Sequence, residues 1–364
     1  MKQGTNAAIM RKRNEKTILS LINLRPISRA EIAKITGLTR AAVTIIIDEL
    51  ISQGYILEEQ TKQATVGRQP ILLSFNGASI YSVGINIRRT CFCVGIVDLN
   101  GHVIMEQKFP ITPPADFFAG IKEIVDMMIQ KAGIERDKIY GVGVATPGPI
   151  DAEKGKILNP PNFKLWHNIN VADKIKECLG FDVFHENVSN AGALAEMYYG
   201  TAKESRNFMT LLVDEGIGSG IVLNRQLFEG INELGHTSIS FDGVLCECGN
   251  RGCLEKYASI PMILAGTGYK SWQEVVDAGD NLLIQKEAEY LSTAITTANN
   301  LFDLDRLILC GELCYCPEKL KSLISETVNR RRLHSKRLKI CEGHVESKAL
   351  VAAALVTHEF FNGF

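Results

Sequence analysis

The sequence has no apolar run long enough to cross a membrane and no apolar segment near its start. No stretch approaches the roughly 18 consecutive apolar residues that a membrane-spanning helix needs. The opening residues, MKQGTNAAIMRKRNEKT, are polar and basic and lack the hydrophobic core of a signal peptide. We therefore expect a cytosolic protein without a membrane partner.

The chain contains 10 cysteines, but nothing in the sequence favours disulfides. In a long chain without a secretion signal, cysteines are more often reduced thiols or metal ligands. The length of 364 residues allows two or three domains, and a hydrophobic content of 46% supports ordinary cores. These values exclude a disordered or fibrous protein.

The net charge of −1 conceals an uneven distribution of charge. Residues 1–70 hold eleven lysines and arginines against six acidic residues, a net of +5, whereas the remaining residues hold 29 against 35, a net of −6. A basic segment ahead of a neutral-to-acidic body is typical of a nucleic-acid-binding domain followed by a second domain.

The basic segment has the order of elements of a helix-turn-helix. An amphipathic pattern over residues 14–24 predicts a first helix, which Pro26 ends. The sequence SRAE (28–31) is a capping box, in which the serine caps a second, short helix and the glutamate reaches back. Gly37 then supplies a left-handed turn, and a third helix is predicted from about residue 38 to about residue 53.

The third helix is predicted to read DNA. Its apolar residues follow the helical spacing of a core-facing side, and they are Val43, Ile46, Ile47, Leu50 and Ile51. The residues left on the other side near its amino end, where a recognition helix meets bases and phosphates, are Thr39, Arg40, Ala41 and Thr44. Arg40 is the main candidate for a DNA contact, whereas Ile45 fits either the groove or the core.

Two short strands after this helix predict a wing. YILEE and ILLSF read as strands, and QTKQATVGRQP joins them. Lys62 and Arg68 in this connection are candidates for contacts to the DNA backbone or the minor groove. A small helical domain for protein contacts is the alternative, but the capping box, the glycine turn, the wing and the basic balance favour a winged helix-turn-helix over residues 1–78.

From about Tyr81 the sequence changes to strands, glycine turns and helices. YSVGINI, CFCVGIVDLNG and HVIMEQKF predict a β-meander with a hairpin at residues 99–101. An amphipathic helix is expected over residues 117–132, then a buried strand in IYGVGVATPG, and further strands separated by helices in residues 211–223 and 306–311. The body is therefore α/β, with two lobes and a cleft between them.

One imidazole and three thiols lie close together in GHTSISFDGVLCECGNRGCLEKYAS. They are His236, Cys246, Cys248 and Cys253, and glycines between the sulfurs allow tight turns. This set suits tetrahedral zinc, and four protein ligands leave no open position, so such a zinc would be structural. A disulfide pair with a free thiol is the alternative. A looser group without a neighbouring histidine is interpreted as ordinary thiols, and it comprises Cys310, Cys314 and Cys316.

Six stretches of the body together resemble the signature blocks of the ROK family, named for repressors, open reading frames and kinases. They are GVGVATPGPID (141–151), NPPNFKLW (159–166), HENVSNAGALAE (185–196), EGIGSG (215–220), ELGH (233–236) and CECGNRGCLE (246–255). The cysteine block is highly specific, and the resemblance runs from about Tyr81 to the C-terminus. With the winged helix-turn-helix in front, the chain is similar to the repressor branch of the family, which includes xylose and N-acetylglucosamine repressors.

The resemblance implies a two-lobed, actin- or hexokinase-like (ribonuclease H-like) ROK domain over residues 79–364. Lobe one would take residues 79–188 with a C-terminal helix at about 345–364, and lobe two residues 189–344. The resemblance also implies the structural zinc described above and a monosaccharide in the cleft. By matched position, the sugar hydroxyls would meet Asn187, Glu233, His236 and Glu255. Carboxylates and an imidazole suit vicinal hydroxyls, although each acid taken singly would fit a capping or surface role.

The resemblance further implies what a ROK sugar kinase needs and this chain lacks. The kinases carry their general base as the aspartate of Asn-Asp-Ala-Asn, and the matching residues here begin with Asn187 and Val188. The first phosphate turn appears as NIRRT (86–90), in which arginines replace two glycines. The second begins with Glu215 instead of threonine, and the third reads CGE (310–312). We therefore expect no ATP and no enzymatic activity, while the two arginines leave another kind of anion site as a minor alternative.

The sequence thus predicts a DNA-binding transcriptional regulator, a repressor of carbohydrate-utilisation genes such as those for xylose. It would sense a sugar or sugar derivative in a catalytically dead kinase-like cleft. Its partners would be operator DNA, a monosaccharide effector and further copies in a homodimer or homotetramer, because palindromic operators pair with two-fold proteins. The alternatives are a sugar kinase with a regulatory head and a regulator controlled by a protein partner. The segment before Glu233 is shorter than in the family, with Asn232 in place of a glycine, so its loop must take another path.

Overall fold

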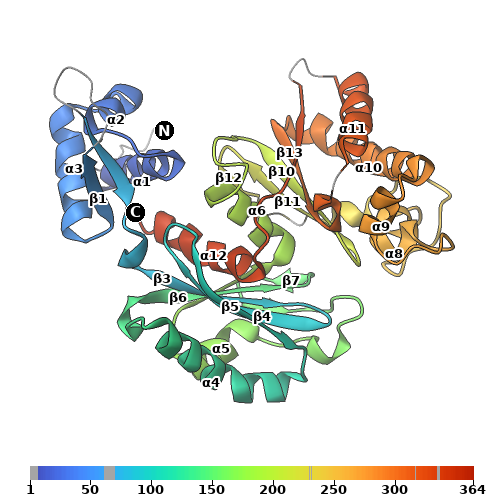
Figure 1. The fold of residues 1–364 in the computed structure, drawn as a ribbon, viewed down its shortest axis with the longest axis horizontal. Coiled ribbons are helices and arrows are strands. Elements are labelled where there is room, and N and C mark those ends of the chain that lie inside the picture. The colour runs from blue at the N-terminus through green and yellow to red at the C-terminus, as the bar shows by residue number, and fades with distance from the viewer. Residues whose placement is uncertain (1–6, 61–69, 229, 231, 316, 334–336) are drawn as a thin grey trace, which may run out of the picture. The chain divides into compact units, whose positions relative to one another are not determined.

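The chain folds into two compact units. The computed structural model describes residues 7–60, 70–228, 230, 232–315, 317–333 and 337–364. The first unit comprises Met1–Val188 with Ser347–Phe364 and the second comprises Ser189–Glu346, so the chain passes between them twice. Each unit contains a mixed five-stranded sheet (Figure 1), which confirms the predicted α/β class. Within the described ranges, no helix combines the length and apolar character needed to cross a bilayer.

The first unit begins with a head of three helices and two strands. Its elements are α1 (Ala7–Leu24), α2 (Arg29–Thr36), α3 (Arg40–Ser52), β1 (Ile56–Gln60) and β2 (Ile71–Phe75), and the two strands pair antiparallel. Ser28 caps α2 by accepting a hydrogen bond from the amide of Glu31 (3.3 Å), and Gly37 ends it with φ of 72°. α1 starts earlier than predicted, because the apolar spacing marked only its buried part, whereas Ile9 and Met10 are exposed.

The rest of the first unit is a sheet covered on both faces. The strands lie in the order β5-β4-β3-β6-β9, and their bounds are β3 (Tyr81–Ile87), β4 (Cys91–Asp98), β5 (Val103–Pro110), β6 (Ile139–Thr146) and β9 (Val183–Asn187). α4 (Pro114–Ala132) and α5 (Val171–Leu179) lie on one face, and α12 (Lys348–Asn362) lies on the other (Figure 1). Short elements complete the unit, namely η1 (Gly77–Ser79), η2 (Arg136–Lys138), η3 (Lys164–Trp166), β7 (Ile150–Asp151) and β8 (Lys156–Ile157).

α12 packs closely on the sheet because glycines face it. A Cβ atom added at Gly84 would lie 2.0 Å from the carbonyl oxygen of Ala349, and one at Gly143 would lie 1.9 Å from that of Ala352. Any side chain at either position would therefore push the helix away from the strands.

The carboxyl end of α12 packs against the head. The rings of Phe360 and Tyr55 meet edge to face with centroids 5.0 Å apart, and those of Phe361 and Phe75 meet in the same way at 5.6 Å. Aromatic pairs of this geometry contribute beyond the area they bury. α12 therefore joins the sheet of the first unit to its head.

The second unit has its sheet in the order β12-β11-β10-β13-β14. The strands are β10 (Phe208–Val213), β11 (Ile217–Leu223), β12 (Gln226–Leu227), β13 (Arg306–Gly311) and β14 (Lys339–Glu342). β10, β13 and β14 run parallel, and β11 runs antiparallel to β10 and β12. The helices are α6 (Val188–Tyr198), η4 (Leu234–His236), α7 (Glu255–Ala258), α8 (Ile260–Ile263), α9 (Trp272–Asp277), α10 (Asn281–Phe302), η5 (Glu312–Cys314) and α11 (Glu318–Arg331).

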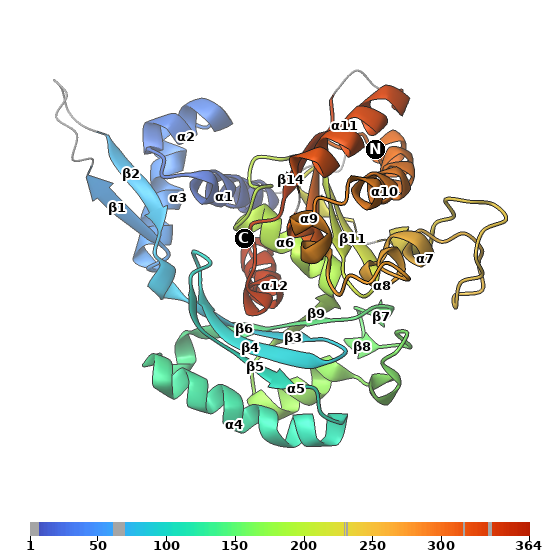
Figure 2. The same cartoon turned by 45° about the vertical axis from the view of Figure 1, so that its right-hand side comes forward.

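Glycines also bring α6 close to β11. A Cβ atom at Gly218 would lie 2.2 Å from the hydroxyl oxygen of Ser189, and one at Gly220 would lie 2.3 Å from the carbonyl oxygen of Ser189. α10 and α11 cover the opposite face of this sheet (Figure 2). Apolar side chains of the sheet and of these helices pack into one core there. Gly218 and Gly220 of EGIGSG therefore have a packing role in this fold.

We expect Gly143→Ala to destabilise the first unit by about 1–3 kcal/mol, because its Cβ would overlap the backbone of α12. Gly120→Ala in α4 is the matched control, since a Cβ there meets nothing within 4 Å and alanine is the better helix former, by roughly 0.5–1 kcal/mol. Urea unfolding of both variants measures the difference. A Gly143→Ala variant as stable as the parent would contradict the close packing of α12.

Candidate functional site

The amino end of α3 presents the residues that the sequence predicts to meet DNA. Thr39 is the N-cap, and its hydroxyl accepts a hydrogen bond from an amide of the first turn (3.2 Å). Arg40 and Ala41 are exposed, and Thr44 is half-buried. Ile45 is 63% exposed, so it lies on the outer side of the helix and not in the core.

Ion pairs hold this helix in the head. Arg29 of α2 pairs with Asp48 of α3 at 2.6 Å and with Glu58 of β1 at 2.7 Å. These two ion pairs join α2, α3 and β1. Lys62 and Arg68, the predicted contacts of the wing, lie outside the described residues.

The predicted zinc ligands lie together in the second unit. The ligand atoms of His236, Cys246, Cys248 and Cys253 all lie within 4.8 Å of one another. Cys246 Sγ is 3.6 Å from His236 Nδ1, and Cys248 Sγ is 3.6 Å from Cys253 Sγ. Tetrahedral zinc with bonds near 2.3 Å to sulfur and 2.0–2.1 Å to nitrogen spaces its ligands by roughly 3.5–3.8 Å, so these distances fit the ion.

Glycines shape the loop that carries the three thiols. Gly249 has φ of 91°, and its amide donates to the carbonyl of Cys246 (2.9 Å), which turns the chain back between two sulfurs. Gly252 has φ of 70°, and a Cβ atom there would lie 1.8 Å from the carbonyl oxygen of Ser240. Only glycine adopts these conformations without strain in so tight a loop.

The three thiols differ in how readily they give up a proton to a metal ion. Burial raises the pKa of Cys253 to about 12, and burial likewise raises the pKa of Cys246. A hydrogen bond from the backbone of Asn250 instead lowers the pKa of Cys248. Cys246 and Cys253 are therefore the two thiols that need a metal ion to become thiolates near neutral pH. When bound, zinc would tie the loop to η4 as a structural cross-link.

Two predicted sugar ligands of the second unit, His236 and Glu255, lie near the first residue of β11. The Glu255 carboxylate accepts a hydrogen bond from the amide of Ile217 (2.8 Å). Gly235, beside His236, runs so close that a Cβ atom would lie 2.3 Å from the carbonyl oxygen of Ile217. Burial raises the pKa of Glu233; His236 opposes this shift and Glu255 adds to it. The three polar side chains thus share one electrostatic environment.

Asn232 anchors the shortened loop before Glu233, a role that the sequence did not reveal. Its side chain accepts a hydrogen bond from the hydroxyl of Ser219 (2.8 Å) and donates one to the carbonyl of the same residue (2.8 Å). A glycine at this position would make neither side-chain bond. The only signal in the sequence was the departure from the family glycine, and it did not identify the partner strand.

Asn187, the fourth predicted sugar ligand, ends β9 in the first unit. The backbone amide of Asn187 donates to the carboxylate of Glu186 (2.7 Å), and Val188 begins α6 directly after it. Asn187 therefore belongs to the first unit, whereas the other three predicted ligands belong to the second.

The residues in place of the first phosphate turn have structural partners. Arg88 closes the β3–β4 turn through a backbone hydrogen bond (2.8 Å), and Arg89 donates its Nε–H to the carbonyl of Pro161 (3.1 Å). Asn86 is fully buried and donates to the carbonyl of Lys348 in α12 (3.1 Å). These three residues therefore have structural contacts in the first unit that involve no phosphate.

Carboxylates surround the other two candidate phosphate turns. Asp214, which precedes Glu215, accepts a hydrogen bond from the amide of Glu312 (2.9 Å). Gly311 has φ of 76°, and a Cβ atom there would lie 2.4 Å from the Asp214 carboxylate. The Glu312 carboxylate accepts from the amide of Trp272 (3.2 Å). Negative side chains at these turns would repel a polyphosphate.

Comparison with known proteins decides the family. The ROK family model matches residues 82–359, and a MarR family model matches residues 12–69. The chain belongs to the ROK family. As a ROK protein with a MarR-type winged helix domain, it has the organisation expected from the sequence.

Named relatives of this ROK protein are regulators. It is 31% identical to the xylose repressor of Bacillus subtilis over 341 residues, which cover 88% of each chain. It is 26% identical to the DNA-binding transcriptional dual regulator NagC of Escherichia coli, covering 98% of this chain and 95% of that protein. The crystal structure of a ROK family transcriptional regulator, a homologue of the E. coli MLC protein, matches 97% of both chains with a TM-score of 0.80 and 26% identity.

ROK kinases share the fold of the body. The crystal structure of a ROK hexokinase from Thermus thermophilus covers 78% of this chain and all of its own, with a TM-score of 0.66 and 24% identity. At this identity the match shows the fold alone. The fold is therefore common to kinases and regulators, and the side chains must decide between them.

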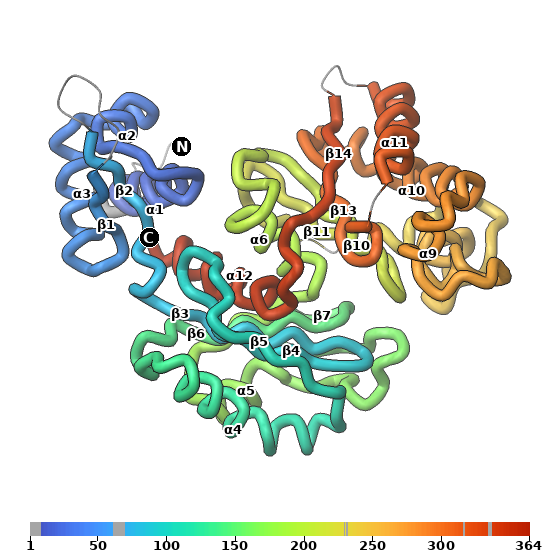
Figure 3. Tube along the Cα trace, in the orientation of Figure 1, coloured from blue at the N-terminus to red at the C-terminus, as the bar shows by residue number. Residues whose placement is uncertain are grey.

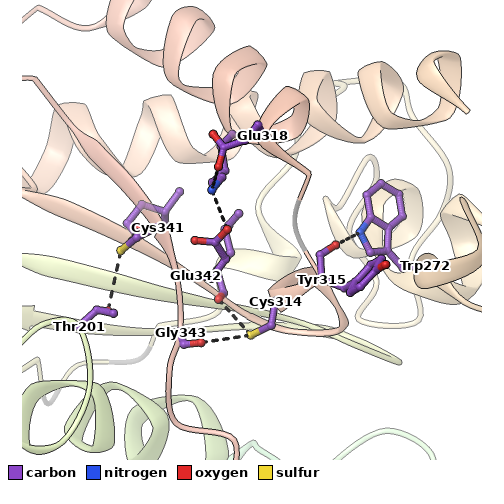
Figure 4. A network of polar contacts seen from close by, with 11 residues as sticks. Thr201, Trp272, Cys314, Tyr315, Glu318, Cys341, Glu342 and Gly343 are labelled. Carbon is purple, nitrogen blue, oxygen red and sulfur yellow. Dashed lines mark hydrogen bonds and ion pairs between the residues drawn. The ribbon is translucent and has the colours of Figure 1, made fainter. Parts of the chain in front are cut away.

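The remaining cysteines form no second metal group in the part of the chain that the structure describes. The thiol of Cys314 lies 3.8 Å from the carbonyl oxygen of Gly343 (Figure 4), and that of Cys310 lies 3.8 Å from the carbonyl oxygen of Ile308. Cys316 lies outside the described residues.

Cys248→Ser is expected to abolish zinc binding, because three ligands without the third thiolate hold the ion far less tightly. Elemental analysis of the purified parent should find about one zinc per chain, and the variant should contain little. Cys314→Ser, which removes an exposed thiol outside the cluster, should keep the parent's content. Full zinc in the Cys248→Ser variant would contradict the assignment.

Proposed function

We propose that this protein is a DNA-binding transcriptional repressor of carbohydrate-utilisation genes that senses a sugar or sugar derivative without phosphorylating it. Relatives named as xylose and N-acetylglucosamine repressors match both its head and its body, which supports a repressor. One chemical contrast carries the proposal. The body keeps polar side chains suited to hydroxyl groups, but Val188 replaces a base and carboxylates occupy the phosphate turns.

In the proposed complex, α3 enters the major groove of operator DNA. The exposed side chain of Arg40 at its amino end would contact a base edge or a phosphate, and Thr39 and Thr44 would contact the backbone. Two heads would engage the half-sites of a palindromic operator, so the protein would act as a homodimer or homotetramer.

The proposed effector site uses Asn187, Glu233, His236 and Glu255 as hydrogen-bonding partners of a monosaccharide. Because His236 Nδ1 faces Cys246, the zinc would take this nitrogen and leave Nε2 for a sugar hydroxyl. One carboxylate oxygen of Glu255 already accepts a hydrogen bond from the amide of Ile217, which fixes the direction of the other oxygen. Such a site discriminates sugars because a misplaced hydroxyl leaves a polar group unpaired.

We infer that α12 carries the signal to the head. The chain returns to the first unit after Glu346, immediately before α12 begins. Within the second unit, the buried carboxylate of Glu196 accepts hydrogen bonds from the amides of His344 (2.9 Å) and Val345 (3.0 Å), so this exit is firmly held. The far end of α12 contacts the head at Tyr55. A sugar would shift the head only through different affinities for two arrangements of the protein.

Arg40→Ala is expected to weaken operator binding by about 10- to 100-fold, as loss of one guanidinium contact to a base typically does. Fluorescence anisotropy with a duplex from the protein's own promoter region measures the change. Lys131→Ala at the end of α4 removes an exposed cation from the body and should bind like the parent. Equal affinity of all three proteins would argue against α3 as the recognition helix.

Sugar sensing predicts that one monosaccharide, or its phosphate, releases the protein from its promoter in a mobility-shift assay. The Glu255→Gln variant should need roughly 10-fold or more of that sugar, because it loses a charged acceptor while an amide oxygen can still bind Ile217. Glu289→Gln, which changes an exposed glutamate of α10, should respond like the parent. Indifference of the parent to every sugar would refute sensing, and sugar-dependent release of ADP from ATP would identify a kinase with a regulatory head.

A further inference from the structure

The second unit carries a cationic surface of its own. The segment RRRLHSKRLK, residues 330–339, contains six lysines and arginines and no carboxylate. The rest of residues 189–346 contains 10 basic and 21 acidic residues. Solvated protein faces usually mix the two signs, so such a separation of charge indicates a negatively charged partner.

The fold brings the described cations of this segment to one edge of the sheet. α11 ends at Arg331, β14 begins at Lys339, and the two elements lie side by side (Figure 3). Buried Val328 and Leu338 anchor the two sides, and the amide of Leu338 donates to the side chain of Asn329 (3.2 Å). We name the exposed residues of this surface the basic edge, and they are Arg330, Arg331, Arg337 and Lys339.

The neighbouring strand β13 adds one more arginine beside Lys339. Arg306, which begins β13, pairs in register with Lys339 and donates to the carbonyl of Thr201 (2.7 Å). The carboxylate of the preceding residue, Asp305, accepts hydrogen bonds from the backbone amides of Arg206 (3.1 Å) and Asn207 (3.0 Å).

A role in stabilising the fold would explain only some of the cations of the basic edge. Arg330 and Arg331 lie in the last turn of α11, where cations stabilise the carboxyl end of a helix. Arg330 also pairs with Glu326 at 3.8 Å, but both side chains are more than 60% exposed, so the pair is weak. Neither effect explains Arg337 and Lys339, which precede and begin β14.

At the other end of α11 and β14, by contrast, a lysine is paired with carboxylates and stabilises the fold. Lys321 at the start of α11 pairs with Glu342 at 2.7 Å and with Glu318. These two carboxylates, which are labelled in Figure 4, raise the pKa of Lys321. The side chain of Lys321 is 17% exposed. The cations of the basic edge, in contrast, face solvent at the opposite end of β14.

We propose that the basic edge binds the sugar–phosphate backbone of DNA beside the operator sequence held by the head. Arginine forks and lysine ammonium groups match phosphate oxygens, and such contacts need no particular base sequence. A head that already holds the duplex would present this backbone at high effective concentration. The inference therefore rests on the proposed DNA-binding function. Exposed Leu301 and Leu333 border the edge and would also suit an acidic protein, but a segment without any carboxylate favours the denser charge of DNA.

The test compares two triple variants of the full chain that lose the same charge. One variant carries Arg330→Gln, Arg331→Gln and Lys339→Gln, and the control carries Lys270→Gln, Lys286→Gln and Lys319→Gln at exposed positions elsewhere in the unit. Affinity for a short operator duplex and for one with long flanks is measured by anisotropy between about 50 and 200 mM salt. Circular dichroism checks that both variants are folded.

On the long duplex, the basic-edge variant should bind about 3- to 30-fold more weakly than the control, and its salt dependence should be less steep by about 0.9 for each lost phosphate contact. On the short duplex the two variants should bind alike. Equal behaviour on the long duplex, with operator binding intact, would overturn the basic edge and leave the proposed function standing. No binding of the parent to either duplex would overturn both. Equal DNA binding combined with lost binding to polyglutamate or to phosphatidylserine vesicles would assign the edge to a protein or a membrane instead.

Discussion

The four ligand atoms of His236, Cys246, Cys248 and Cys253, held within 4.8 Å of one another, are the constraint on which the second unit's proposed function depends. The loop that carries the three thiols has tight turns at Gly249 and Gly252, and its apolar residues Phe241, Val244 and Leu245 are exposed. Two residues beyond the last thiol, Glu255 bonds to the first residue of β11. A bound zinc would therefore set both the ring of His236 and the start of α7, and with them the polar groups available to a sugar.

Close packing plays the corresponding role in the first unit. Gly84 and Gly143 allow α12 to rest directly on the strands, and aromatic rings at its far end meet the head. A helix seated without intervening side chains has little freedom to bend, so a displacement at its beginning would be transmitted along its length. The same body fold serves kinases. In this ROK protein the body is packed against a winged helix domain through α12.

The parts that the sequence predicted well are those fixed by local rules. Gly37 ends α2, YSVGINI forms β3 and the metal ligands converge, because turn chemistry, alternation and ligand spacing act over short stretches. The hydrogen bond of Asn232 with Ser219 and the contact of Phe360 with Tyr55 were not predicted, because they join distant segments and no local sequence pattern indicates them. The sequence placed Gly218 and Gly220 within the EGIGSG block of the family resemblance, whereas the structure gives them close neighbours in α6. The partners predicted for Asn187, Glu233 and Glu255 remain predictions, because they concern a ligand.

The central claim is that sugar binding in the body and DNA binding by the head are coupled. Coupling is reciprocal, so operator DNA must change the affinity for the sugar by the same factor by which the sugar changes the affinity for DNA. Calorimetric titration of the releasing sugar into the zinc-loaded protein, with and without a saturating operator duplex, measures this directly. A repressor of the proposed kind should bind the sugar about 5- to 150-fold more weakly in the presence of the operator. The same sugar affinity with and without DNA would contradict the claim.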